Sequence, residues 1–137
     1  MKSHSLTISI IIFSVTLLFG ACSNCPELEG TWVGFTDGKS PADWSLTIKG
    51  DQYALIREDS NLWYRGQIKL NSNCVLKKID FEITDASNRA YNGKTTLGIY
   101  RIEEGTLTIV AGNPGGQLRP LSFDEIEKTV VYIFVRS

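Results

Sequence analysis

The stretch TTLGIYRIEEGTLTIVA, residues 95–111, decides the fold class of this 137-residue chain. Two runs rich in β-branched and other apolar residues flank Glu103-Glu104-Gly105, the composition of two strands joined by a tight hairpin turn. Short runs of the same kind recur at residues 30–36, 44–49, 52–57, 62–70, 79–84 and 129–136. No stretch keeps a helical period, and residues 123–128 are long enough for one turn only. This regular spacing predicts an all-β, antiparallel sandwich or barrel of about eight strands.

The first two dozen residues have the features of an export signal. Lys2 precedes an apolar run from Leu6 to Phe19, which is short for a membrane-spanning helix. The following Gly20-Ala21-Cys22 resembles the lipobox of bacterial lipoproteins, in which cleavage before the cysteine precedes lipid attachment. A freely secreted protein would need a small residue where this chain has Phe19. We therefore predict a lipoprotein signal peptide at residues 1–21, a lipidated Cys22 with its tether at residues 22–29, and a barrel domain at residues 30–137.

The predicted lipid also indicates where the protein resides. Ser23, and not an aspartate, follows Cys22, which in the proteobacterial sorting rule resembles an outer-membrane destination. We expect a protein of the bacterial cell envelope that faces the periplasm or the exterior, with the membrane as a partner through the anchor.

Charge and histidine content exclude several classes of function. Beyond residue 21 the chain carries 13 basic and 15 acidic residues, and the basic ones are scattered, so we expect no nucleic-acid partner. The one histidine, His4, lies in the predicted signal peptide. The remainder cannot build Ser-His-Asp or Cys-His catalysis, nor the common imidazole metal sites. We predict a protein that is not an enzyme and that uses no cofactor or metal.

Two cysteines remain once Cys22 is assigned to the lipid. Cys25 and Cys74 would meet an oxidising compartment, where a disulfide between them is expected. Such a bridge closes a loop of about fifty residues, worth roughly 4 kcal/mol on a chain-entropy estimate. The alternative is two unpaired thiols.

Gly30-Thr31-Trp32 at the first predicted strand and Arg136 at the end of the last resemble the lipocalin and wider calycin barrels. In those folds the Trp closes the barrel base and a late basic residue packs across its indole, which implies this role for Trp32 and Arg136. The strings LEGTW (28–32), LTIKGDQY (46–53), KKIDFEITD (77–85) and GKTTLGIYRIEEGTLTI (93–109) resemble a small family of bacterial lipocalin-like domains. That family is described mainly from planctomycetes and has no established activity. The resemblance implies a small lipocalin-like barrel.

A closed barrel of this size is either filled by side chains or holds one small ligand. The expected ligand is small and apolar or amphipathic, with Tyr53 and Tyr64 as polar anchors. The candidates for its pocket are Trp44, Leu46, Tyr53, Leu55, Tyr64, Leu97, Ile99 and Arg119. The alternative is a protein-interaction module with a filled barrel, an envelope inhibitor or assembly factor. Its binding patch would be an exposed set of Trp63, Arg65, Tyr100 and Tyr132.

Overall fold

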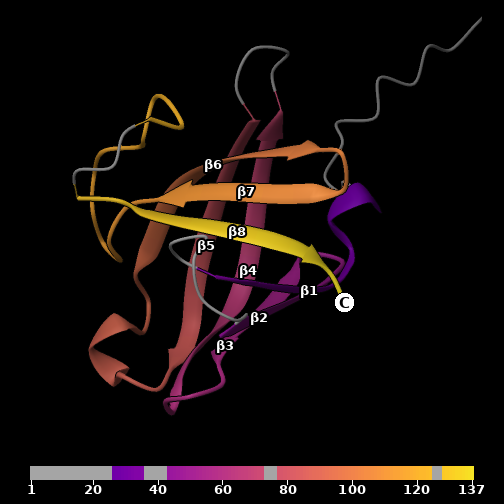
Figure 1. Ribbon diagram of the computed structural model, residues 1–137. Coiled ribbons are helices and arrows are strands. Elements are labelled where there is room, and N and C mark those ends of the chain that lie inside the picture. Colours follow the sequence, from indigo (N-terminus) through magenta and orange to yellow (C-terminus); the bar gives the residue numbers. More distant parts are fainter. Residues whose placement is uncertain (1–25, 36–42, 73–76, 125–127) are drawn as a thin grey trace, which may run out of the picture.

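The computed structural model describes residues 26–35, 43–72, 77–124 and 128–137, which form a closed barrel of eight antiparallel strands (Figure 1). Each strand pairs with the next along the chain, and the last pairs with the first. The prediction of a small all-β barrel of about eight strands is confirmed. In the part of the chain that the structure describes, no helix has the length and apolar character to cross a membrane.

Each strand begins and ends within two residues of a predicted run. Their bounds are β1 (Gly30–Phe35), β2 (Trp44–Lys49), β3 (Gln52–Arg57), β4 (Leu62–Ser72), β5 (Lys77–Ala86), β6 (Thr95–Glu103), β7 (Thr106–Ala111) and β8 (Val130–Arg136). Two short 3-10 helices accompany them, η1 (Pro26–Leu28) before the barrel and η2 (Arg89–Tyr91) between β5 and β6. The sequence predicts only a polar loop where η2 lies.

The β6–β7 hairpin has the tight turn that its sequence predicts. Glu103 pairs with Thr106, so Glu104 and Gly105 form a two-residue connection. Both have positive φ, 51° and 77°. Positive φ at both central residues is the type I′ geometry, whose twist matches that of the flanking strands.

The pairing of β4 with β5 contains an irregularity that bends the wall of the barrel. Their register shifts between Arg65 and Gly66. A Cβ at Gly66 would overlap the carbonyl oxygen of Glu82 and lie 2.8 Å from the amide nitrogen of Thr84. Glycine therefore permits a closer approach of the two backbones than any other residue would.

One end of the barrel, which we call the base, is closed by Trp32. Its indole is 1% exposed, and its Nε1 donates a hydrogen bond of 3.0 Å to the carbonyl of Leu28 in η1. The Arg136 guanidinium lies 4.3 Å from the centroid of the indole ring. It also donates to the carbonyl oxygens of Glu27 and Glu29, each at 2.6 Å. The two residues expected to close the base are thus in contact, and Arg136 in addition fastens η1 to the barrel.

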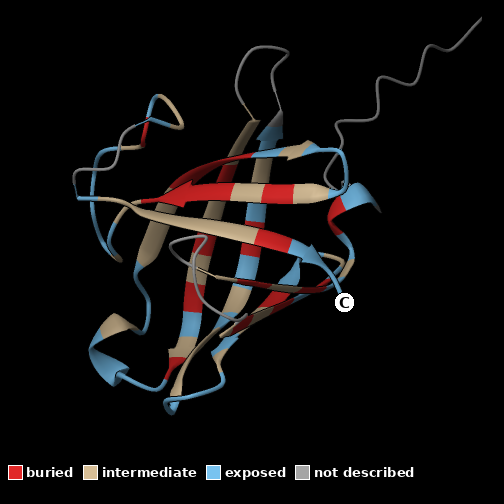
Figure 2. Ribbon diagram, viewed as in Figure 1, coloured by how far each residue is buried: buried red, intermediate tan, exposed pale blue. Residues whose placement is uncertain are grey.

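Along β2 and β5, buried residues alternate with more exposed ones (Figure 2), so one face of each of these strands belongs to the core inside the barrel. The interior near the base is filled by Trp32, Ile48, Ile79 and Leu107, each at most 2% exposed. Room for a ligand therefore has to lie towards the opposite end, which we call the mouth.

The segment 112–124, which follows β7, covers the outer face of β6 and β7. Arg119 holds it there, because its guanidinium donates to the carbonyl of Gly98 at 2.7 Å and pairs with Asp80 at 2.6 Å. Under this segment Ile99 and Val110 are 0% exposed, although Ile99 alternates with the inward-facing Tyr100 in β6 and Val110 with the inward-facing Ile109 in β7. The barrel therefore has a second, smaller apolar layer outside its wall.

Candidate functional site

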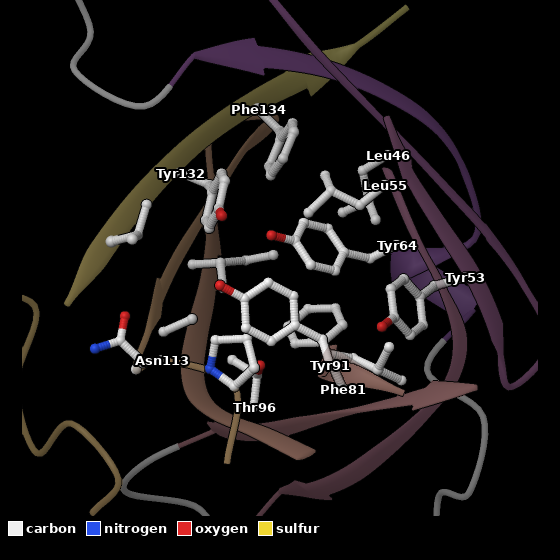
Figure 3. Close-up of a pocket in the computed structure, with 16 residues that line it drawn as sticks. Leu46, Tyr53, Leu55, Tyr64, Phe81, Tyr91, Thr96, Asn113, Tyr132 and Phe134 are labelled. Carbon is white, nitrogen blue, oxygen red and sulfur yellow. The ribbon is translucent and has the colours of Figure 1, made fainter. Parts of the chain in front are cut away.

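The half of the barrel interior next to the mouth contains a cavity of about 180 Å³ (Figure 3). Residues of seven strands, β2 to β8, and of the two loops at the mouth form its wall. The lining residues are Leu46, Tyr53, Leu55, Tyr64, Phe81, Ile83, Tyr91, Thr96, Ile109, Ala111, Gly112, Asn113, Pro114, Val130, Tyr132 and Phe134. Among these described residues none is charged, and aromatic rings make up much of the wall. The cavity is therefore an apolar chamber with a few uncharged polar groups.

Ring packing sets the positions of the aromatic side chains. Phe81 meets the ring of Tyr53 edge-on at 5.0 Å between centroids. Phe134 stacks on Tyr132 at 5.9 Å with an angle of 9° between the planes. Trp44 meets the other side of Tyr132 edge-on at 5.6 Å. Such pairs fix ring orientation as well as bury area, so the tyrosine hydroxyls have defined directions.

Burial keeps these tyrosines protonated. Desolvation raises the pKa of Tyr132 to about 12, and the nearby Tyr64 contributes to the shift. Desolvation likewise raises the pKa of Tyr64 and of Tyr53. Since the phenol form prevails at any physiological pH, each hydroxyl can donate a hydrogen bond.

Tyr91 reaches the cavity from η2, at the mouth. Its ring lies 6.0 Å from that of Tyr64. The Asn88 side chain caps η2 by accepting from the amide of Ala90 at 3.1 Å. Asn92 holds the other end, because its Oδ1 accepts from the amide of Ala86 at 2.9 Å. Tyr91 is therefore held over the mouth by hydrogen bonds that tie its loop to the end of β5.

The same loop is also braced from β4. Asp85 accepts from Asn92 Nδ2 at 3.3 Å and pairs with Arg65 at 2.9 Å. The Arg65 guanidinium and the Asn92 amide lower the pKa of Asp85. The carboxylate thus stays ionised down to acid pH, and the brace persists there.

The structure brings together four of the eight residues predicted for the pocket. Leu46, Tyr53, Leu55 and Tyr64 line the cavity. Trp44 does not line it, but its ring packs against the cavity residue Tyr132.

Leu97, Ile99 and Arg119 lie elsewhere, and their assignment to the pocket is wrong. Thr96 lines the cavity and Tyr100 belongs to the interior core, so the residues that alternate with them face outwards. Ile99 is buried there beneath the segment that follows β7. Arg119 binds backbone carbonyls of β5 and β6 on that same outer side. Its role is to hold this segment and not to meet a ligand.

The exposed aromatic patch that the alternative function requires is not present. Tyr100 is 1% exposed, and Tyr132 lines the cavity. Trp63 and Arg65 do remain together on the outside of β4, with the guanidinium 5.0 Å from the indole centroid. Two of the four members thus belong to the interior.

Several cavity residues were not anticipated from the sequence. Tyr91 and Thr96 are among them, and the prediction that Tyr132 faces outwards is wrong. Alternation along β8 offers a signal for Tyr132, since Val130 and Phe134 share its face. Tyr91 lies in a loop, where no periodicity indicates its direction.

The predicted lipid site Cys22 and the predicted disulfide Cys25–Cys74 lie outside the described residues. Nearby, the Lys77 ammonium pairs with the Glu27 carboxylate at 3.3 Å. This contact joins the positions two residues after Cys25 and three after Cys74. Both assignments stay predictions. Within residues 26–35, 43–72, 77–124 and 128–137, no cluster of three His, Cys, Asp or Glu side chains is arranged to hold a metal.

Comparison of the chain with family models, with curated proteins and with solved structures gives no match.

Proposed function

We propose that this barrel binds one small, largely apolar molecule in the cavity at its mouth and releases it unchanged. The observation that carries the proposal is the cavity itself, a hollow of about 180 Å³ whose described walls bear no charge. Ligand sites are typically concave and apolar with a few directed polar groups, and a mouth of a β-barrel is one of their usual places. A barrel whose interior served only as a core would be packed to the same density throughout.

The size of the cavity limits the ligand. A cavity of about 150 Å³ lined by Leu, Ile and Phe takes one benzene molecule. The present one is slightly larger, so we expect a compact, ring-sized molecule and not a long acyl chain. The filled core near the base leaves a longer molecule no room to continue inwards.

Binding without conversion accounts for the chemistry of the wall. The lining contains no Ser, Cys, Lys, His, Asp or Glu among its described members. It therefore offers neither a nucleophile–base pair nor paired carboxylates for acid–base work. The raised pKa of Tyr64 and of Tyr132 keeps these phenols protonated, so neither is in the phenolate form that a general base requires.

We further propose that the barrel is a lipoprotein of the bacterial envelope, anchored through Cys22, with the outer membrane as its place. The lipobox-like sequence before Cys22 supports this proposal. The role is then that of an anchored carrier or receptor for a small molecule of the envelope.

The test is native mass spectrometry of the protein purified from the cells that make it. We expect a small-molecule adduct that is lost on denaturation. Ala111→Leu adds three carbon atoms inside the cavity, since Ala111 lines it, and should abolish the adduct. The matched control is Ala54→Leu, which makes the same change in β3 between the inward-facing Tyr53 and Leu55 and should retain it. A wild-type protein without an adduct, or an adduct that survives Ala111→Leu in a folded protein, contradicts the proposal.

A further inference from the structure

Three tyrosine hydroxyls from different parts of the barrel point into the same region of the cavity. Tyr64 comes from β4, Tyr91 from η2 and Tyr132 from β8, and Figure 3 shows their oxygens directed towards one another across the open space. The ring centroids of Tyr64 and Tyr91 are 6.0 Å apart. They form a cluster of donors in a chamber whose other polar side chains are those of Tyr53, Thr96 and Asn113.

The described protein offers these hydroxyls no partner of its own. Tyr64, Tyr91 and Tyr132 make ring contacts, but none of their oxygens hydrogen-bonds to another described residue. None of the three side chains is fully buried, and their hydroxyls face the cavity. Three converging donors without a protein acceptor are therefore available to a bound molecule.

We infer that the ligand is an uncharged, planar, ring-sized molecule whose acceptor oxygen, such as that of an aryl carbonyl, is held by the hydroxyls of Tyr64, Tyr91 and Tyr132. This inference rests on the proposed binding function and specifies the chemistry of its ligand. Flat ligands suit a wall built from aromatic rings, which favour stacked and edge-on contacts at centroid separations of about 4.5–7 Å.

An anion does not fit the same site. A buried charge needs a partner of opposite sign, and the described lining has none. The nearest cations are already engaged or lie at the rim. Lys94 Nζ lies 5.9 Å from the Tyr91 ring centroid, and Arg57 pairs with Asp43 and Asp59 at 3.4 and 3.0 Å. A carboxylate ligand would therefore lose its hydration with only neutral donors in return.

Three probes of equal size separate the possibilities. Acetophenone, α-methylstyrene and benzoate each have a phenyl ring and differ in the group attached, which is a neutral carbonyl, a hydrocarbon or an anion. Their dissociation constants are measured by NMR titration of the full mature chain and of Tyr132→Phe and Tyr64→Phe. Tyr100→Phe is the matched control, since Tyr100 is a buried tyrosine that does not line the cavity.

Loss of one neutral hydrogen bond corresponds to about a 2- to 12-fold change in affinity. We expect Tyr132→Phe and Tyr64→Phe each to weaken acetophenone by that factor, with α-methylstyrene changed by less than about twofold. Tyr100→Phe should leave both unchanged, and benzoate should be the weakest of the three.

The outcomes distinguish the two proposals. If the Tyr→Phe changes alter the affinities for acetophenone and α-methylstyrene equally, the hydroxyls do not recognise the ligand, and the inference is wrong. The proposed binding function is not contradicted by that result. Tightest binding by benzoate overturns the preference for an uncharged ligand. Failure of all three probes to shift the resonances of cavity residues overturns the proposed function together with the inference.

Discussion

Replacement of Arg136 by methionine tests how the base of the barrel is held closed. The change keeps a long apolar stem and removes the guanidinium, which lies 4.3 Å from the Trp32 ring centroid and donates to the carbonyls of Glu27 and Glu29. Arg136 lies at the end of β8, paired in register with Trp32. The substitution therefore removes the contacts of Arg136 with η1 and with Trp32 without disturbing the strand pairing, and the Trp32–Leu28 hydrogen bond remains.

The expected loss follows from these contacts. A hydrogen bond from a charged donor contributes about 1.5–3 kcal/mol, and the solvent exposure of Arg136 reduces each to the lower end of that range. A cation–π contact at an exposed site adds about 0.5–1 kcal/mol. Together they predict a decrease of about 3.5–4 kcal/mol in the free energy of unfolding, a large part of the about 5–15 kcal/mol typical of a domain. For a chain of this size the melting temperature should fall by roughly 10 °C.

Urea denaturation followed in parallel by far-UV circular dichroism and tryptophan fluorescence measures the loss. Arg101→Met is the matched control, because Arg101 also lies 4.3 Å from an aromatic centroid, that of Phe123, with an ion pair of 3.8 Å to Glu103. It should cost less than about 1 kcal/mol. Arg136→Lys keeps the charge but not the planar fork, and should fall between the two.

Equal effects of Arg136→Met and Arg101→Met would refute the reasoning, since the hydrogen bonds to η1 would then contribute nothing. A wild-type-like Arg136→Lys would show that charge over the indole suffices.

Four further predictions concern the wall, the tyrosines and the cysteines. Gly66→Ala should lower the free energy of unfolding by about 1–3 kcal/mol or more, because its Cβ would overlap the Glu82 carbonyl. The control is Gly112→Ala, whose Cβ would lie 3.6 Å from the nearest atom; it should have little effect in the same denaturation assay. In a spectrophotometric titration Tyr53, Tyr64 and Tyr132 should stay protonated at pH 10, because burial raises their pKa values in the folded protein. The free energy of unfolding should therefore be unaffected below pH 10 and fall between pH 10 and 12. Ionisation of all five tyrosines near pH 10 in the folded protein would contradict this prediction. Mass measurement after alkylation should find Cys25 and Cys74 blocked without reductant and both labelled after reduction, whereas two labelled thiols in unreduced protein would exclude the bridge. Cys22→Ser should release the protein from membranes, and persistent lipid labelling of that variant would place the anchor elsewhere.

The sequence predicts the strands well because each carries its own local signal. Residues 44–49 alternate between apolar and polar side chains, and Glu104-Gly105 supplies the positive φ values of the tight turn. These features depend on neighbours along the chain, so they can be read without knowledge of the fold.

The inward face of β6 could not be read in this way. Leu97 and Ile99 are more apolar than Thr96 and Gly98, yet it is the latter set that faces the interior. The outer face of β6 is itself covered by the segment that Arg119 holds, so apolar residues occur on both faces of the strand. The alternation of apolar and polar residues therefore does not indicate which face points into the barrel. The covering segment is distant in sequence, and nothing local reveals it.

The sequence does not predict the position of Tyr91 at the mouth, for a related reason. Tyr91 owes its position to Asn88, Asn92 and Asp85, polar residues whose pattern in the sequence is that of a solvated loop. Only the fold brings the Tyr91 ring beside Tyr64, from a strand that begins almost thirty residues earlier. Sites that depend on loop side chains are specified by tertiary contacts and not by periodicity.

The closed base gives the molecule a direction. The polypeptide enters through η1 and ends after β8, both at the base, while η2 and the loop containing Asn113 surround the opposite end (Figure 1). A lipid four residues before Pro26 would therefore hold the barrel by its sealed end, with the opening turned away from the bilayer. The ligand would then enter from the aqueous compartment and not from the bilayer. The anchor would therefore determine from which compartment the protein takes its ligand.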